Sequence, residues 1–174
     1  MASANAHSHD PALHLYDAIR SGASGRRHRE LVGEAARYLG AVSILLVGVV
    51  HAQQYYGAYF SVVPTIGTLF LLSFIGAGSV GVVLLAPVRR LGREVGDAML
   101  VVAALGAISI ALGTLVSLLI SEYTPLFGFM ESGYRLAVVL TLLFDVMTTV
   151  FLGVFVALVA PQLVRTIATK RRLR

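Results

Sequence analysis

The sequence predicts an all-α membrane protein: an antiparallel bundle of four transmembrane helices with an amphipathic, basic N-terminal segment in the cytoplasm. Three observations support this prediction. Of the 174 residues, 57% are hydrophobic and 13% are charged, whereas a soluble domain carries about 25% charged residues. Four long apolar segments recur along the chain. The basic residues gather in the segments that would lie on one side of a membrane.

The apolar segments cover residues 38–56, 65–86, 98–120 and 136–160. Each is long enough to cross a bilayer, because a helical span takes roughly 20 residues. The connecting loops are short, which favours antiparallel neighbours. Pro87 and Pro161 follow the second and fourth segments, and we expect them to end those helices. Residues 1–37 and the basic tail 161–174 then lie outside the membrane.

Small side chains recur every four residues in three of these segments. Such stripes let helices approach closely in a membrane, where no hydrophobic effect drives helices together. We therefore expect them at helix contacts, either within the chain or between chains. The three stripes are Ser73, Ala77 and Gly81; Ser109, Gly113 and Ser117; and Thr149, Gly153 and Ala157.

The basic residues predict the orientation. Of the 14 Lys and Arg residues, only Arg135 falls outside the N-terminal segment, the loop between the second and third spans, and the C-terminal tail. Because basic loops stay in the cytoplasm, both termini are expected there. The excess of arginine over lysine, with abundant Ala, Gly and Val, is typical of a high-GC bacterium and indicates the bacterial inner membrane. The chain has no cysteine, which excludes disulfides and thiolate metal sites.

The N-terminal segment combines a helix start with basic residues next to the membrane. Asp10 and Pro11 are typical of a helix N-terminus, and residues 12–20 would form a short amphipathic helix that the small-residue run 21–25 interrupts. Basic residues beside a membrane attract anionic lipid by about 1 kcal/mol each, although they also fix topology. The lipid-facing set is Arg26, Arg27, Arg29, Arg171 and Arg172. These are membrane flanks and not an organised basic face, so nucleic acid is not an expected partner.

Asp145 is the sharpest polar feature of the spans. It lies ten residues after Arg135, which places it about 15 Å deep at the rise of an α-helix. A carboxylate at that depth costs roughly 2.5–3.5 kcal/mol on insertion scales, so it is expected to face the bundle. Thr141 and Thr148 fall on the same helical face. The residue is either a proton or cation site, a polar contact to another helix, or a structural acid hydrogen-bonded to a threonine or carbonyl.

His51 is the natural partner for Asp145, because it is the one histidine within an apolar segment. The first and fourth spans would run in opposite directions, which brings the two side chains to similar depths. The alternative is a histidine turned to the headgroups beside Gln53 and Gln54. A haem site usually takes two axial ligands from bundle helices, and a second histidine is missing from the spans.

Glu122 and Glu131 are the acidic residues expected on the outer side. With His51 they could form a carboxylate–imidazole cluster, but their spacing matches no metal-ligand pattern, so we predict no metal site. The sequence has neither a glycine-rich phosphate loop nor a serine elbow. We therefore predict no catalytic residue and expect no cofactor.

Two short stretches resemble a known group of proteins. Pro64, Ile66 and Gly67 open the second span just after His51, and residues 126–131 (LFGFME) lead into the fourth. These motifs resemble small, uncharacterised four-helix integral membrane proteins of high-GC Gram-positive bacteria. The resemblance covers residues 38–160 and implies the same four-helix fold. It implies no activity, and it does not extend to the N-terminal segment.

These observations lead to three functional hypotheses. The first is a small accessory or structural subunit that packs against partner membrane helices or a second copy, surrounded by lipid. The second is a component of proton- or cation-coupled transport that uses Asp145 and His51. The third is a redox membrane anchor that binds haem or a quinone. The sequence favours the first hypothesis, and the other two are its alternatives.

Overall fold

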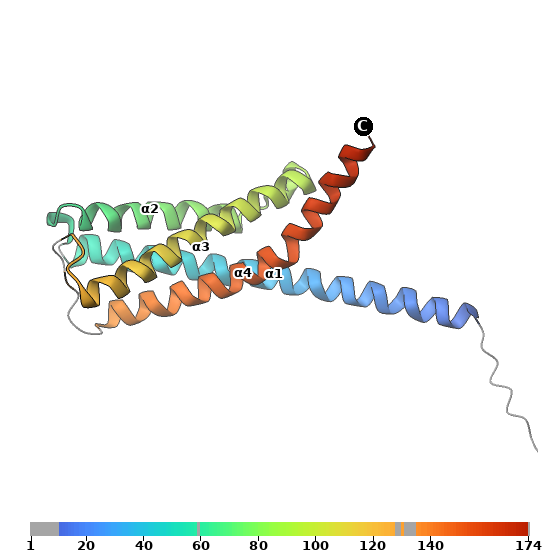
Figure 1. Ribbon diagram of the computed structural model, residues 1–174, viewed down its shortest axis with the longest axis horizontal. Helices are drawn as coiled ribbons and strands as arrows, with labels where there is room; N and C mark the ends of the chain where they lie inside the picture. Colours follow the sequence, from blue (N-terminus) through green and yellow to red (C-terminus); the bar gives the residue numbers. More distant parts are fainter. Residues whose placement is uncertain (1–10, 59, 128–129, 131–134, 174) are drawn as a thin grey trace, which may run out of the picture. The chain divides into compact units, whose positions relative to one another are not determined.

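The computed structural model describes residues 11–58, 60–127, 130 and 135–173, and it describes side chains from residue 24 onward. Four α-helices dominate these residues: α1 (Pro11–Gly57), α2 (Ile66–Leu85), α3 (Arg93–Tyr123) and α4 (Leu136–Arg172). Two short 3₁₀ turns, η1 (Phe60–Val62) and η2 (Val88–Leu91), lie before and after α2 (Figure 1). The chain divides into two compact units, Met1–Val32 and Gly33–Arg174. The contacts below lie within the second unit.

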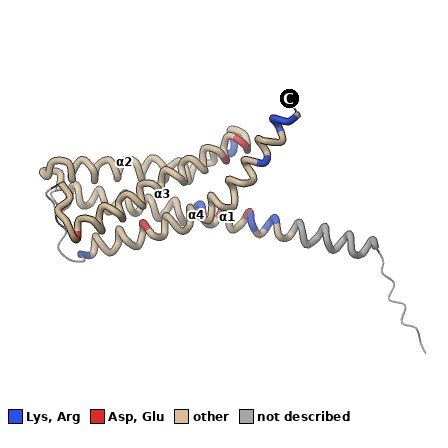
Figure 2. Tube along the Cα trace, viewed as in Figure 1, with Lys and Arg blue, Asp and Glu red and all other residues tan. Residues whose placement is uncertain are grey.

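All four helices are long and apolar enough to cross a membrane, which confirms the predicted class of multi-pass helix bundle. Charged residues of the second unit lie mainly toward the helix ends, and one acidic position stands apart in the first part of α4 (Figure 2). This distribution is expected of spans, because a charge in the hydrocarbon is costly.

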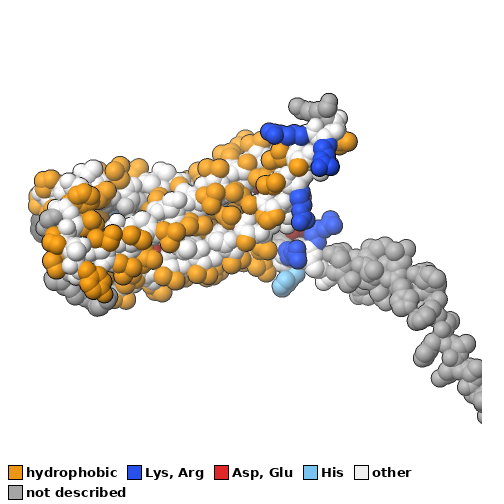
Figure 3. Space-filling model, in the orientation of Figure 1, with side chains coloured by type: hydrophobic (Ala, Val, Ile, Leu, Met, Phe, Trp, Pro, Cys, Tyr) orange, Lys and Arg blue, Asp and Glu red, His pale blue; other side chains and the backbone are white. Residues whose placement is uncertain are grey.

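The bundle presents apolar side chains both inward and outward. Large buried side chains from each helix form the core, including Ile44, Leu84, Leu100 and Phe155. Leucine and valine side chains also cover the outside between the helix ends (Figure 3). The most apolar window of α1 is 56% buried, against 17–28% for the windows of the other helices. Helix α1 is therefore the most enclosed helix, and the others expose most of their apolar surface.

Glycines set the closest helix contacts. A Cβ at Gly40 would clash with Leu152 of α4, and one at Gly81 would lie 2.6 Å from Leu45 of α1. A Cβ at Gly48 would meet Ala77 at 3.3 Å. Ala77 and Gly81 of the predicted stripe therefore support close packing of α2 on α1, as expected for small residues in spans, whereas Ser73 lines a cavity.

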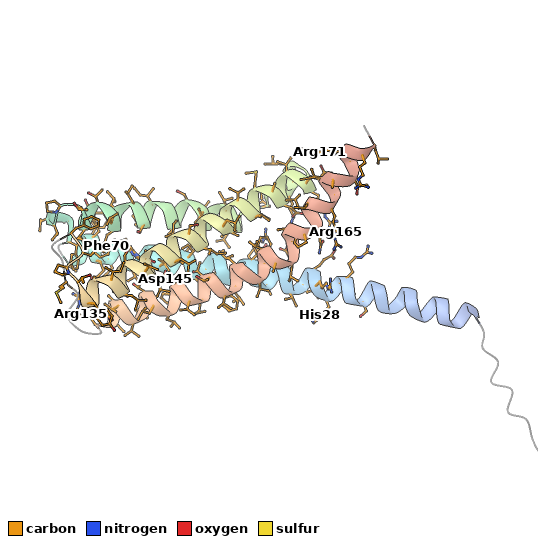
Figure 4. The ribbon with its side chains drawn as sticks, in the orientation of Figure 1. His28, Phe70, Arg135, Asp145, Arg165 and Arg171 are labelled. Atoms are coloured by element: carbon orange, nitrogen blue, oxygen red, sulfur yellow. The ribbon has the colours of Figure 1, made fainter. Side chains whose placement is uncertain are left out.

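The predicted helix ends are correct at Pro87 and wrong at Pro161. Helix α2 ends at Leu85, and Ala86 is extended with ψ 147°, because the residue before a proline avoids the α conformation. Helix α4 continues through Pro161 to Arg172. It changes direction between Asp145 and Arg165 (Figure 4). A proline removes one helical hydrogen bond and kinks the helix, but the following turns can still form.

The predicted interruption at residues 21–25 is also wrong, because α1 runs through this stretch. Glycine costs about 1 kcal/mol in a helix interior relative to alanine, which weakens a helix without forbidding it.

Candidate functional site

A cavity of about 420 Å³ lies among the four helices, toward the η1 end of the bundle. Helix α3 crosses α2 obliquely, and the two helices separate toward that end (Figure 1). Their contacts lie nearer the other end, where a Cβ at Gly76 would meet Ile110 at 3.1 Å and one at Gly106 would meet Val80 at 3.5 Å. We call this space the lateral cavity. Its polar lining side chains are His51, Gln54, Ser73, Ser109, Thr114, Ser117, Ser121, Arg135 and Thr141.

The lateral cavity reaches the outer surface of the bundle between α2 and α3. Its lining includes Leu72, which is 59% exposed, and the exposed residues Ser109 and Gly113. A Cβ at Gly113 would meet nothing within 4 Å. The stripe of Ser109, Gly113 and Ser117 therefore lines a cavity, where the sequence predicted a tight helix contact.

His51 is buried on the inner side of this cavity, with 4% of its surface exposed. It does not project to the surface as Gln53 does. Its Nδ1 lies 2.9 Å from the carbonyl oxygen of Val47, and its ring meets the ring of Phe70 edge-on at 5.4 Å. Because a carbonyl oxygen can only accept, Nδ1 carries the hydrogen, and Nε2 of the neutral ring is an acceptor.

Asp145 is fully buried, as its depth predicted, and it faces the bundle (Figure 4). Its partner is a residue that the sequence pattern does not indicate: the hydroxyl of Thr114 on α3 donates to Oδ2 over 2.7 Å. No hydrogen bond joins Asp145 to His51 among the described residues. Thr114 nevertheless also lines the lateral cavity, so it lies between the buried acid and the space beside His51.

Of the two threonines predicted to share a face with Asp145, only Thr141 lines the lateral cavity. Thr141 is half-buried and lines the cavity, whereas Thr148 is fully buried. The Thr148 hydroxyl and Oδ1 of Asp145 have no hydrogen-bond partner among the described residues. Thr149 donates to the backbone carbonyl of Asp145 over 2.9 Å, so its hydroxyl serves the helix itself.

The outer acidic residues do not assemble into a described site. Glu122 is half-buried near the end of α3, and Glu131 lies outside the described residues. Within the part of the chain that the structure describes, no three His, Asp or Glu side chains are placed to hold a metal ion. The cluster of His51, Glu122 and Glu131 therefore stays a hypothesis.

The basic residues fall into two groups. Arg26, Arg27, Arg29, Arg171 and Arg172 are exposed, as expected for side chains near lipid headgroups. Arg37 is instead 4% exposed, and it pairs with Glu34 at 3.0 Å. Glu34 also binds Arg89, whose Nε lies 2.6 Å from Asp97. We call Glu34, Arg37, Arg89 and Asp97 the ionic cluster.

The two carboxylates of the ionic cluster favour the charged form of its central arginine, Arg89. Burial by itself would lower the pKa of Arg89, but hydrogen bonds to Asp97 and Glu34 and their negative charges outweigh burial and raise the pKa. The cluster joins α1, η2 and α3. The sequence pattern predicts only a topological role for these arginines and does not indicate the cluster.

Comparison with known proteins adds no assignment: no family model, curated protein or solved structure matches this chain.

Proposed function

We propose that the chain is a multi-pass protein of the bacterial inner membrane that binds a small, bilayer-dissolved amphiphile in the lateral cavity. One observation supports this most strongly: the cavity has a buried imidazole on its inner side and exposed leucine side chains at its rim. Ligand sites are typically concave and apolar, with a few convergent polar groups. The lateral cavity has this character.

The size of the cavity supports binding over imperfect packing. Protein interiors are close-packed, and voids larger than a water molecule are few. A space of about 420 Å³ falls within the range of roughly 300–1,000 Å³ for small-molecule sites. Small side chains on α3 leave this space open, since Ser109, Gly113 and Ser117 all line it.

The rim supports entry from the bilayer. Leu69 and Leu72 of α2 line the cavity and are 41% and 59% exposed. Across from them, Ser109 and Gly113 of α3 are also exposed. In a span these side chains face lipid, so a molecule dissolved in the hydrocarbon reaches the cavity without crossing water.

The three hypotheses drawn from the sequence differ in whether they are compatible with this proposal. A small quinone belongs to the class of bilayer-dissolved ligands, so that part of the redox hypothesis is compatible with it. A haem held by two histidines of one chain is not compatible with the sequence, because His51 is the only histidine after residue 28. The accessory-subunit and transport hypotheses stay predictions, since an exposed apolar surface suits both lipid and a partner helix.

The proposed orientation places four antiparallel spans with both termini in the cytoplasm. Contact pairs support this order: Gly48 lies near Ala77 and Leu45 near Gly81, while Gly76 lies near Ile110 and Val80 near Gly106. In both helix pairs, residue numbers rise along one helix as they fall along the other. The arginine distribution supports the cytoplasmic assignment.

The orientation can be tested by labelling, because the chain has no cysteine of its own. A membrane-impermeant maleimide applied to intact spheroplasts should label Met130→Cys, and it should label Leu91→Cys only after lysis. Both positions are exposed, at 52% and 68%. Labelling of Leu91→Cys in intact spheroplasts would contradict the proposed orientation.

The binding function can be tested by narrowing the cavity mouth. Gly113 lines the cavity, and a Cβ at this position would meet nothing within 4 Å. Gly113→Leu therefore adds a side chain at the cavity mouth without a clash at its Cβ. We expect wild-type protein, extracted with its lipid in copolymer nanoparticles, to carry a small lipophile detectable by mass spectrometry of the solvent extract. Gly113→Leu should retain less than about a tenth of it, a loss equivalent to about 1.4 kcal/mol or more of binding free energy.

Gly153→Leu is the matched control. A Cβ at Gly153 of α4 also meets nothing within 4 Å, but Gly153 does not line the cavity. This variant should keep the lipophile at the wild-type level. If wild type and both variants carry only bulk phospholipid in equal amounts, the proposed binding function is wrong.

A further inference from the structure

The polar groups of the lateral cavity differ in what they can still offer to a ligand. A hydroxyl has one hydrogen, so once it donates to the protein it presents only oxygen lone pairs. Ser109 donates to the carbonyl of Leu105 over 2.9 Å, and Ser121 donates to that of Leu118 over 2.7 Å. Thr114 donates to Asp145. Three hydroxyls of the lining are therefore acceptors toward the cavity.

Like these hydroxyls, His51 offers a hydrogen-bond acceptor and no free hydrogen. Its Nδ1 hydrogen is donated to the carbonyl oxygen of Val47, which leaves the lone pair of Nε2. No described residue is paired with Nε2. The ring is also held in place, because it meets Phe70 edge-on and Phe70 in turn meets Phe60 at 5.2 Å. A fixed acceptor at a largely apolar wall selects strongly for a donor, since an unpaired buried polar group is costly.

We infer that the lateral cavity selects an amphiphile that carries a hydroxyl or N–H donor on an apolar body, with His51 Nε2 as the principal acceptor. This inference rests on the proposed function and adds the hydrogen-bond polarity of the ligand. It favours a phenol, a hydroquinone or an alcohol over the corresponding ether or quinone, because ethers and quinones offer only acceptors. Arg135 also lines the cavity, with its guanidinium 5.8 Å from the Phe60 ring.

A pair of probes that differ in one hydrogen-bond donor tests this inference. The probes are para-octylphenol and its methyl ether, para-octylanisole, which share an apolar body. Binding is measured by titration calorimetry of the full chain in phosphatidylcholine nanodiscs, and empty nanodiscs correct for partitioning. Wild type should bind the phenol about tenfold more tightly than the ether, as expected when one ligand satisfies a buried acceptor and the other does not.

Variants of His51 assign the preference to this residue. His51→Phe keeps a ring against Phe70 but removes the acceptor, so both probes should bind within about twofold of each other. His51→Gln retains a side-chain acceptor and should keep a preference for the phenol, which provides a second test if the Phe variant does not fold.

The possible outcomes separate the inference from the proposed function. Equal binding of the two probes to wild type, or tighter binding of the ether, overturns the inference and leaves the proposed function standing. An unchanged preference in a folded His51→Phe overturns the role of His51. Binding of neither probe to wild type overturns the inference together with the proposed function.

Discussion

Glu34→Ala is expected to destabilise the protein by about 3 kcal/mol, the lower end of the range for breaking a buried ion pair. Arg37 is 4% exposed and has Glu34 as its acidic partner at 3.0 Å. Removing the carboxylate leaves a buried guanidinium without its counter-charge, and Nε of Arg37 already has no partner. Glu34 is itself one-third exposed, so water reaches part of the site, and for this reason we expect the lower end.

A surface ion pair at the same end of the bundle provides the control for Glu34→Ala. Glu94 pairs with Lys170 at 3.0 Å, but the two side chains are 42% and 58% exposed. Exposed pairs contribute at most about 1 kcal/mol, so Glu94→Ala should be nearly silent. Stability is measured by sodium dodecyl sulfate titration in mixed micelles, with helicity as the signal. Equal effects of the two variants would show that the ionic cluster does not hold α1, η2 and α3 together.

The sequence predicts the fold well because the bilayer restricts it so strongly. Backbone groups in hydrocarbon need internal hydrogen bonds, so an apolar stretch of sufficient length has to be a helix in this class of protein. The bounds of α2, Ile66–Leu85, accordingly lie within one residue of the prediction. The error at Pro161 has a local cause: a helix near the membrane surface can lose one hydrogen bond to water and continue.

The site was predicted less completely because helix periodicity shows which residues share a face of one helix, but not which residues of another helix they contact. The depth of Asp145 predicted its burial, and its own spacing predicted the threonine face. Nothing in that spacing identifies Thr114, which is 31 residues away on α3. Which helix lies against the acid depends on how α3 and α4 cross, and that depends on the packing of all four helices.

The stripe of Ser109, Gly113 and Ser117 illustrates the same limit. Small residues let two helices approach closely, but they leave open space where the helices diverge. Where the helices converge, the stripe gives a close contact, and where they diverge, it gives a cavity. The sequence pattern is the same in both situations. The ionic cluster has a similar origin: Glu34 and Arg37 are adjacent on one helix, whereas Arg89 is 55 residues from Glu34.

Substitutions of Asp145 should destabilise the protein increasingly in the order Asn, Leu and Lys. Asp145→Asn keeps the shape and can still accept from Thr114, so it should change stability by less than about 0.5 kcal/mol. Asp145→Leu removes the acceptor, but Thr114 can turn its hydroxyl to the carbonyl of Ile110 or Ala111, at 3.1 and 3.0 Å. The cost should be about 1–2 kcal/mol, as for interhelical hydrogen bonds in membranes.

Asp145→Lys should be the most damaging, at about 3 kcal/mol or more, because it puts a cation where Asp145 is fully buried and charge is costly at membrane depth. Val146→Lys tests charge at the same depth on the outer side of the bundle, since Val146 is 50% exposed. There a long side chain can extend toward the interface, so the cost should be smaller. Equal losses would mean that insertion, and not the interior of the bundle, determines the effect.

Double-mutant cycles then identify the partner of Asp145. With Thr114→Val, the coupling to Asp145→Leu should be about 0.6–1.7 kcal/mol, the range for hydrogen bonds between membrane helices. With His51→Phe, the effects should add within about 0.5 kcal/mol, because no hydrogen bond joins these residues and additivity holds for independent sites. Coupling of His51 to Asp145 as large as that of Thr114 would restore the pairing predicted from the sequence. It would also make the acid part of the cavity's binding chemistry, since His51 and Thr114 both line that space.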